Sequence, residues 1–364
     1  MKYIKGFDTL RALAIILVII AHWGPEFPKN TAPGLVKQML VLGGDFGVYL
    51  FFVLSGFLIT SILLNEKSKN ENENRLIVIK NFFIRRSLRI FPIYYIFILF
   101  CFFNYEFVRE HIAYYLTYTS NILPYRANHS NILAHTWSLS VEEQFYLLWP
   151  WLIIYIPSKY LKHTMFLSII IGLAARYMVV FVWHHGYPFL SINCIDSFAI
   201  GALYALARLN KETCKQFEKG FRTLFPVLLF LLWRIAPYGG LPVAVIFEKF
   251  MCDIIALGLI IFAINNEYVW IKKYVLENTV LNYIGRISYG LYLYHFTLGP
   301  RYDVFIAAYA KAHPGTPAFF YNYYSAYCIK LTMLFIICWL SFMLIEQPIL
   351  RIKKRFEYAP SKAS

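Results

Sequence analysis

Apolar residues occur along this chain in long stretches that are separated by short charged segments. A helix needs about 20 apolar residues to cross the hydrocarbon core of a bilayer, and ten stretches come near that length. The pattern predicts an all-α fold: a polytopic membrane helix bundle with about ten transmembrane helices. The predicted spans are Leu10–Trp23, Gly47–Leu64, Ile90–Phe103, Leu139–Ile156, Met165–Trp183, Ser191–Leu209, Phe221–Ile235, Val243–Ile264, Tyr283–Leu298 and Tyr324–Ile345.

The composition supports this class of protein. Of the 364 residues, 59% are hydrophobic and only 15% are charged, whereas a soluble chain averages about a quarter charged residues. The stretch His111–Leu123 is too short and too polar to span, and we expect it in the interface. The six cysteines are scattered singly, without a CxxC pair or Cys/His ligand spacing, so no metal site is predicted.

The net charge of +15 indicates a membrane surface rather than nucleic acid, because Lys and Arg cluster between the apolar spans. Cytoplasmic loops carry the excess of Lys and Arg. With the N-terminus inside, 25 of the 35 basic residues fall in inside segments. Ten spans with both termini in the cytoplasm fit this distribution. Residues 1–350 then form one transmembrane domain, followed by a basic cytoplasmic tail over 351–364.

Arg11 and His22 are an unusual pair of ionisable residues in the first span. Such side chains at membrane depth are functional candidates because they are costly to place there. Eleven positions advance a helix by about 3.06 turns and about 16 Å, so both residues project from nearly the same face. The alternative is that Arg11 anchors the cytoplasmic end of the helix and His22 lies in the interface beside Trp23.

A second cluster opens the third span, where Arg85, Arg86 and Arg89 lie within the segment FFIRRSLRIFPIYY. Three guanidinium groups at a cytoplasmic helix start can bind phosphates, since arginine offers bidentate donors. Anchoring of the helix at the membrane surface is again the alternative.

A third cluster, HTWSLSVEEQFY, begins at His135 and enters the fourth span. Ser138 is predicted to cap the helix, which places Glu142 and Glu143 in its first turns. Two carboxylates that enter the outer leaflet are poorly explained by capping alone, so the cluster is a candidate site. Isolated ionisable residues occur in other spans, where each is most simply a satisfied interhelical hydrogen bond: Asp196, Asp253, His295 and Glu346.

These motifs, in this order, resemble acyltransferase family 3, the ten-span O-acyltransferases of bacterial surface glycans. The resemblance covers essentially the whole chain. It rests on Arg-x10-His, LFFVLSGFLI, RRSLRIFPIYY, HTWSLSVEEQFYLLWP, DSFAIGAL, GRISYGLYLYH and a late EQP. It implies transfer of an acyl group, usually acetyl, from acyl-CoA to a hydroxyl of a glycan (O-antigen, capsule or exopolysaccharide) or secreted glycoside. It also implies a multi-pass protein of the bacterial cytoplasmic membrane, in contact with lipids and with no permanently bound cofactor.

The resemblance also implies roles for individual residues. His22 takes the place of the catalytic histidine, Arg11 that of its partner, and Glu142 that of the motif glutamate, which could orient the imidazole or bind the sugar. The arginines of the second cluster would bind acyl-CoA: Arg85, Arg86 and Arg89. Acceptor binding or structural support is expected from Asp45, Ser55, His135, Trp137, Ser138, Asp196 and His295.

One departure from the family pattern concerns the residue before the LFF run. Many members have an acidic residue there, whereas this chain has Tyr49, with Asp45 four residues earlier.

Two reaction routes stay open at this stage. His22 could act as general base on the acceptor hydroxyl, or a transient acyl-histidine could form. The alternative from another class is a transporter or flippase for a lipid-linked sugar or small anion, although the sequence shows no internal repeat. A structural or assembly protein would leave the ionisable residues in the spans unexplained.

Overall fold

The computed structural model describes residues 4–24, 32–69, 75–126, 132–184, 189–235, 242–265 and 268–353. These ranges are helical and include no strand, which confirms the all-α class. The α-helices are α1 Gly6–Trp23, α2 Ala32–Lys69, α3 Arg75–Asn104, α4 Glu106–Glu110, α5 Ile112–Leu116, α6 Leu123–Arg126, α7 Thr136–Tyr155, α8 Ser158–Tyr177, α9 Ile195–Ala207, α10 Lys211–Ile235, α11 Pro242–Asn265, α12 Val269–Ile271, α13 Thr279–Arg286, α14 Ser288–Ala312, α15 Tyr323–Ser341 and α16 Gln347–Lys353.

The membrane character of the chain agrees with the length and composition of its helices. Each of the ten predicted spans overlaps a helix. Five helical stretches in the described ranges are long and apolar enough to cross a bilayer: Gly6–Trp23, Gly43–Lys69, Arg75–Asn104, Ser158–Val182 and Tyr323–Ile352. The segment that we expected in the interface, His111–Leu123, contains the short helix α5 and a 3-10 turn over Ser120–Ile122, and it ends where α6 begins.

Two predicted boundaries differ from the structure. The span Tyr283–Leu298 is interrupted at Ile287, where α13 ends and α14 begins. Just before this interruption α13 packs closely against α1, since a Cβ on Gly285 would overlap the backbone carbonyl of Asp8. The basic tail was expected from residue 351, but α16 continues to Lys353, and residues 354–364 lie outside the described ranges.

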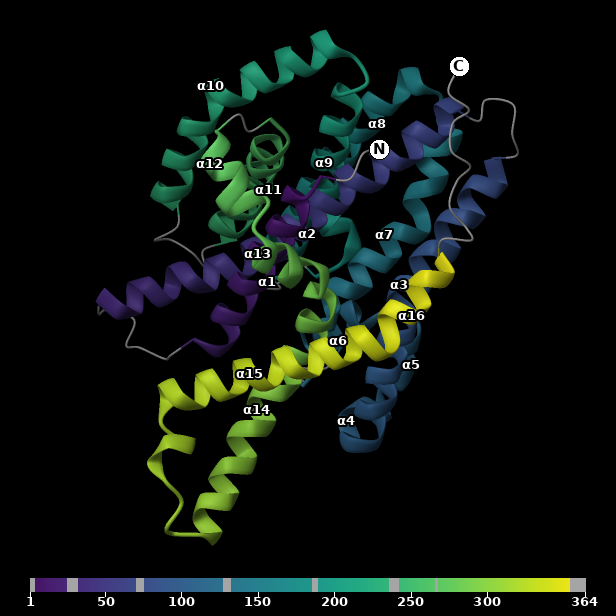
Figure 1. Ribbon diagram of the computed structural model, residues 1–364. Helices are drawn as coiled ribbons and strands as arrows, with labels where there is room; N and C mark the ends of the chain where they lie inside the picture. The colour runs from purple at the N-terminus through teal and green to yellow at the C-terminus, as the bar shows by residue number, and fades with distance from the viewer. Residues whose placement is uncertain are drawn as a thin grey trace.

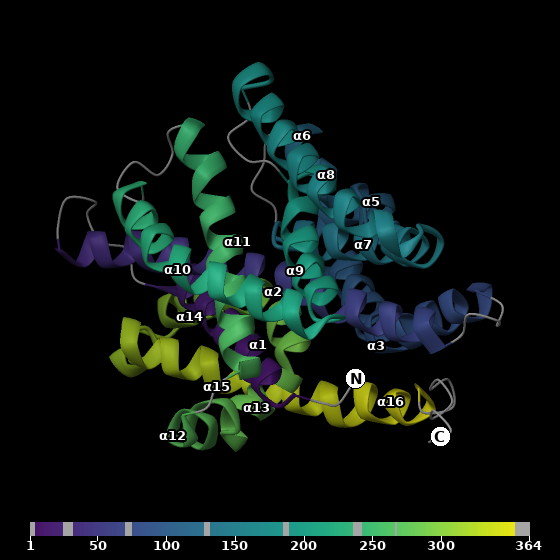
Figure 2. The same cartoon turned by 90° about the horizontal axis from the view of Figure 1, so that it is seen from above.

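Helix α1 lies at the centre of the molecule, between α2 on one side and α13 on the other (Figures 1 and 2). It also contacts α11 and α14. Many of its apolar residues are completely buried, including Ala14, Ile15 and Val18, whereas Leu13 is exposed. Because Arg11 and His22 belong to this central helix, their side chains are held near opposite ends of the bundle core.

Helices α2 and α9 approach each other closely. A Cβ on Gly56 would overlap the carbonyl of Phe198, and a Cβ on Gly201 would overlap that of Val53. Small residues permit such an approach between membrane helices. This contact explains the Ser-Gly pair in the second span, and it fixes the position of Ser55 beside the cavity described next.

Candidate functional site

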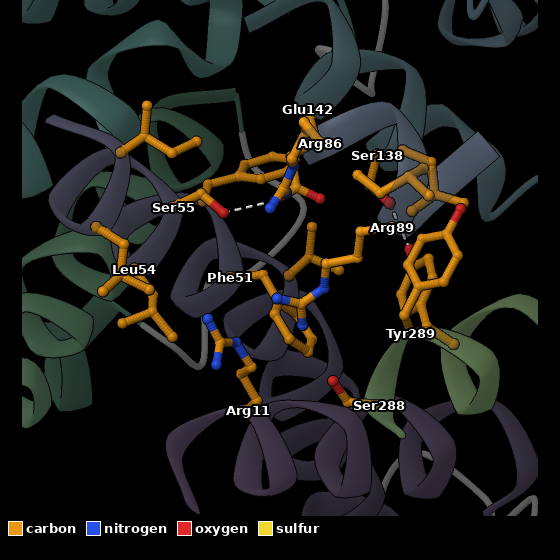
Figure 3. Close-up of a pocket in the computed structure, with 17 residues that line it drawn as sticks. Arg11, Phe51, Leu54, Ser55, Arg86, Arg89, Ser138, Glu142, Ser288 and Tyr289 are labelled. Atoms are coloured by element: carbon orange, nitrogen blue, oxygen red, sulfur yellow. Dashed lines mark hydrogen bonds and ion pairs between the residues drawn. The ribbon is translucent and has the colours of Figure 1, made fainter. Parts of the chain in front are cut away.

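A cavity, here called the arginine cavity, opens between five helices: α1, α2, α3, α7 and α14. Its charged lining consists of Arg11 from α1, Arg86 and Arg89 from α3, and Glu142 from α7, and Ser55 from α2 lies beside them. Figure 3 shows the three guanidinium groups entering the same space from two different helices. Two of the predicted clusters and one residue of the first span therefore meet at a single site.

Two of the three arginines of the second cluster line this cavity, Arg86 and Arg89, which are three positions apart on α3. Around the helix axis Arg85 is about 100° from Arg86 and about 40° from Arg89, on the side of Arg89 away from Arg86. Arg85 is half-buried and is not among the cavity-lining residues. The arginine set at the cavity is thus Arg11, Arg86 and Arg89 rather than the consecutive cluster that the sequence predicts.

The carboxylate of Glu142 is held by three neighbours. It accepts hydrogen bonds from Ser55 Oγ at 2.5 Å and from the hydroxyl of Tyr146, one turn along α7. Arg86 Nη2 lies 3.5 Å from the same Oε1 atom, and the Arg86 guanidinium stacks over the Tyr146 ring at 3.7 Å. Glu142 and Tyr146 therefore position Arg86, and Glu142 is not a partner of His22, so its expected role in orienting the imidazole is not supported.

The positive charge of the arginine cavity exceeds its negative charge. Arg11 donates to the buried carboxylate of Asp8 at 2.8 Å, and Arg86 faces Glu142. Arg89 forms no hydrogen bond or ion pair with any residue in the described ranges. An unbalanced guanidinium in a partly buried site is costly unless a ligand supplies the counter-charge. The cavity is therefore suited to an anion.

His22 lies at the other end of α1, and a second histidine fixes its ring. Nε2 of His295 is 3.1 Å from Nδ1 of His22, and Nδ1 of His295 is 2.7 Å from the carbonyl oxygen of Tyr292. Because a carbonyl only accepts, Nδ1 of His295 carries the proton. Nε2 of the neutral His295 ring is then an acceptor, and Nδ1 of His22 donates to it. Nε2 of His22 consequently keeps its lone pair.

His22 does not line the arginine cavity. It is exposed and lines a second cavity, here called the histidine cavity, together with Trp23, Asp303, Tyr323 and Lys330. Arg11 and His22 both belong to α1, as predicted, but Arg11 lines the arginine cavity and His22 lines the histidine cavity. Asp303 and Lys330 were missed as site residues. The signal was available for Lys330, an ionisable residue inside the predicted span Tyr324–Ile345.

A layer of hydrogen-bonded side chains separates the two cavities. Ser138, which lines the arginine cavity, shares a 2.5 Å hydrogen bond with the Tyr292 hydroxyl. That hydroxyl donates to the carbonyl of His135. The His135 ring is buried, lies 3.2 Å from the Leu293 carbonyl through Nε2, and contacts His295 edge-on at 5.3 Å between centroids. His135 and His295 thus support His22 from behind.

The third sequence cluster also contains residues with purely structural contacts. Helix α7 begins at Thr136, so Ser138 is not its N-cap; its hydroxyl donates to the carbonyl of His135 instead. The helix starts three residues earlier than predicted, which brings His135 to the cap position. Trp137 packs against Phe189 and Phe52.

Asp196 belongs to a buried group of four charges, here called the charge network. Arg176 from α8 makes a bidentate pair with Asp196, and Lys249 from α11 bridges Asp196 and Asp253 at 3.0 and 2.9 Å. All four side chains are at most 3% exposed. Asp196 is therefore a satisfied interhelical partner, as predicted for isolated residues of this kind. Asp253, by contrast, pairs with Lys249 of its own helix α11, and its Oδ1 has no hydrogen-bond partner in the described ranges.

The position that departs from the family pattern faces this network. Lys249 Nζ lies 5.0 Å from the centroid of the Tyr49 ring, so an aromatic face occupies the place of a carboxylate beside this lysine. Asp45, one turn earlier on α2, is exposed.

Comparison with known proteins gives the chain a family. A family model described as an acyltransferase domain matches residues 4–343. The peptidoglycan O-acetyltransferase OatA of Listeria monocytogenes serovar 1/2a is 29% identical over 330 residues, which cover 82% of this chain and 49% of that protein. The O-acetyltransferase OatA of Staphylococcus aureus (strain MRSA252) is 26% identical over 399 residues, 100% of this chain and 60% of the relative.

The chain spans about half to three-fifths of the length of these curated relatives. No solved structure gives a significant match. The family model nevertheless covers nearly the whole chain and includes both cavities. The chain therefore belongs to acyltransferase family 3.

Proposed function

We propose that the enzyme moves an acyl group, most simply acetyl, from cytoplasmic acyl-CoA to a hydroxyl of a cell-surface glycan or secreted glycoside. The observation that carries the proposal is the state of His22. Its Nδ1 is held by His295, while Nε2 keeps a lone pair on a ring that opens into the histidine cavity. In this proposal about ten spans cross a bacterial cytoplasmic membrane, with both termini in the cytoplasm.

The chemistry assigned to His22 is general base catalysis. Nε2 takes the proton of the acceptor hydroxyl while its oxygen attacks the thioester carbonyl. The new C–O bond forms, the C–S bond breaks, and the CoA thiolate leaves with the proton that the imidazolium returns. The hydrogen bond to His295 keeps the ring oriented and in one tautomer. The acyl-histidine route requires the same nitrogen as nucleophile.

The donor is assigned to the arginine cavity because of its charge. Arg11, Arg86 and Arg89 supply donors for an anionic group. In this proposal the phosphates of the donor bind to these guanidiniums, and its pantetheine arm extends toward His22. Arg11 and His22 are about 16 Å apart along α1, a length comparable to the arm that joins the phosphates of CoA to its thioester. To bring the thioester to His22, the arm must pass the hydrogen-bonded layer formed by Ser138 and Tyr292.

The test uses purified protein in detergent with radiolabelled acetyl-CoA and a soluble oligosaccharide. We expect His22→Ala to lower transfer of label by about 100-fold or more, since general base catalysis contributes 10²–10⁴-fold. Binding of acetyl-CoA should persist because the arginine cavity is intact. His163→Ala, an exposed histidine on α8, is the matched control and should retain transfer.

Each other outcome has a definite meaning. Equal transfer by wild type and His22→Ala would remove His22 from the mechanism. Folded wild-type protein that binds acetyl-CoA without turning it over, or does not bind it, would reject the transferase proposal and favour the transporter alternative.

A further inference from the structure

We propose that the histidine cavity is the acceptor site and that it binds an electrically neutral saccharide, with the Asp303 carboxylate as hydroxyl acceptor and an aromatic wall beside it. The inference rests on the proposed function and specifies its second substrate. Its elements come from three helices that converge at His22: the end of α1, the middle of α14 and the start of α15.

The charges of the histidine cavity balance within the described lining. Lys330 Nζ lies 3.1 Å from both carboxylate oxygens of Asp303. In the arginine cavity, by contrast, three guanidiniums face two carboxylates, Glu142 in the lining and Asp8, the partner of Arg11. An anionic ligand is therefore attracted by the arginine cavity, whereas in the histidine cavity the cation Lys330 is already neutralised by Asp303. The two cavities are therefore suited to substrates of different charge.

The two partners of the Asp303–Lys330 pair are not equally exposed. The lysine side chain is only 10% exposed, whereas that of Asp303 is 56% exposed. A carboxylate offers about four acceptor positions, and the ammonium occupies one on each oxygen. The remaining lone pairs face the cavity, where donors such as sugar hydroxyls can reach them. Lys330 lies on the buried side of the Asp303 carboxylate and orients it through the ion pair.

Aromatic rings form the rest of the wall. Trp23, Phe296, Tyr321 and Tyr323 line the cavity. Large rings with a polar edge suit ligands that have one apolar and one hydroxylated face. A pyranose ring is such a ligand, because its C–H bonds gather on its faces and its hydroxyls project from the rim.

The wall is connected to the catalytic histidine pair. Trp23 Nε1 donates to the carbonyl of His295 at 3.2 Å, and the Tyr323 hydroxyl donates to the carbonyl of Trp23 at 3.1 Å. Helix α14 reaches the Trp23 ring at Gly299, where a Cβ would lie 2.6 Å from Nε1. Asp303 follows one turn later on the same face of α14. A saccharide at Asp303 is consequently adjacent to His22.

The experiment measures transfer from acetyl-CoA to chitotetraose, a neutral N-acetylglucosamine oligomer, and to an oligogalacturonate of similar length as the anionic counterpart. Wild type should favour chitotetraose. Asp303→Asn should raise the acceptor KM about tenfold, because a hydrogen bond to a charged group is lost, while the acetyl-CoA KM moves less than about twofold. Lys311→Met, an exposed site on α14, is the control for surface charge.

The swapped variant Asp303→Lys with Lys330→Asp separates binding from structure. It restores the ion pair but buries the carboxylate and exposes the ammonium. If the pair only holds α14 against α15, the swap should recover the wild-type acceptor KM. If Asp303 binds hydroxyls, the acceptor KM should stay raised although the thermal stability returns.

The remaining outcomes either contradict the acceptor site while leaving the proposed function standing, or contradict both. An unchanged acceptor KM in Asp303→Asn, recovery in the swap, or preference for the anionic oligomer overturns the acceptor site while transfer itself continues. A wild type that releases CoA from acetyl-CoA but labels neither oligosaccharide overturns the saccharide assignment alone. Absence of any acetyl-CoA turnover rejects the proposed function first.

Discussion

The arginine cavity and the charge network place similar side chains inside the same bundle with opposite results. In the network, two cations, Arg176 and Lys249, face two anions, Asp196 and Asp253. All four side chains are buried. In the arginine cavity, three guanidiniums face two carboxylates: Arg11 pairs with Asp8, Arg86 faces Glu142, and Arg89 has no ion-pair partner in the described ranges.

The difference shows that charge balance, more than depth, separates structural from functional ionisable residues in this bundle. A buried ion pair returns most of its desolvation cost through its own contacts. In the charge network each cation faces an anion, and these ion pairs link α8, α9 and α11. In the arginine cavity one guanidinium lacks an ion-pair partner in the described ranges, so the cavity can still bind an anionic ligand.

The largest expected effect comes from unbalancing the network. Arg176→Met leaves Asp196 and Asp253 facing only Lys249, with one uncompensated buried negative charge. Removal of one partner from a buried pair costs about 3–5 kcal/mol. We expect most of the protein to be lost from the folded fraction, measured by size-exclusion chromatography in detergent after heating over a range of temperatures.

Folded Arg176→Met that lacks transfer activity would contradict this comparison, because the network would then serve catalysis rather than stability. Arg222→Met, a substitution on the surface of α10, controls for a general effect of removing an arginine and should melt close to wild type.

The network could be predicted only in part. Asp196 and Asp253 are recognisable in the sequence as polar residues inside apolar spans. Their partners Arg176 and Lys249 are separated from Asp196 by 20 and 53 positions, so their pairing depends on which helices are neighbours. That arrangement follows from close contacts such as those of Gly56 and Gly201, which hydropathy does not encode.

For the candidate site, too, the features that depend on one helix could be predicted from the sequence, and those that depend on the packing of several helices could not. The single-helix relation of Arg11 to His22 follows from periodicity alone, and the helical segments could be located from apolar stretches. The partner of His22 is His295, more than 270 positions later, and no local pattern joins them. The separation of Arg85 from Arg86 and Arg89 required the orientation of α3 against α1 and α7.

The second effect concerns the cavity and should leave stability unharmed. Arg89→Gln removes a guanidinium without an ion-pair partner, so the melting temperature should not fall. Transfer from acetyl-CoA should drop between about tenfold and 100-fold, since a charged hydrogen bond to a ligand contributes about 1.5–3 kcal/mol. The two quantities are measured on the same preparation by melting in detergent and by labelled transfer.

Arg85→Gln is the matched comparison, one turn away on the same helix and outside the cavity lining. It should lose clearly less transfer activity than Arg89→Gln. Equal losses in the two variants would mean that the consecutive arginine cluster acts as a unit at the membrane surface, and the cavity would lose its special status.

The smallest effect is expected when charge balance is kept. Lys249→Met combined with Asp253→Asn removes one cation and one anion and leaves the bidentate Arg176–Asp196 pair. Replacement of a balanced buried pair is often close to neutral, so the double variant should melt within a few degrees of wild type. Lys249→Met alone and Asp253→Asn alone each leave one buried charge without its partner, so each should melt at a lower temperature than the double variant. This strong non-additivity is the mark of contacting charges; if the double variant melts as low as the sum of the singles requires, size and shape rather than charge hold the network together.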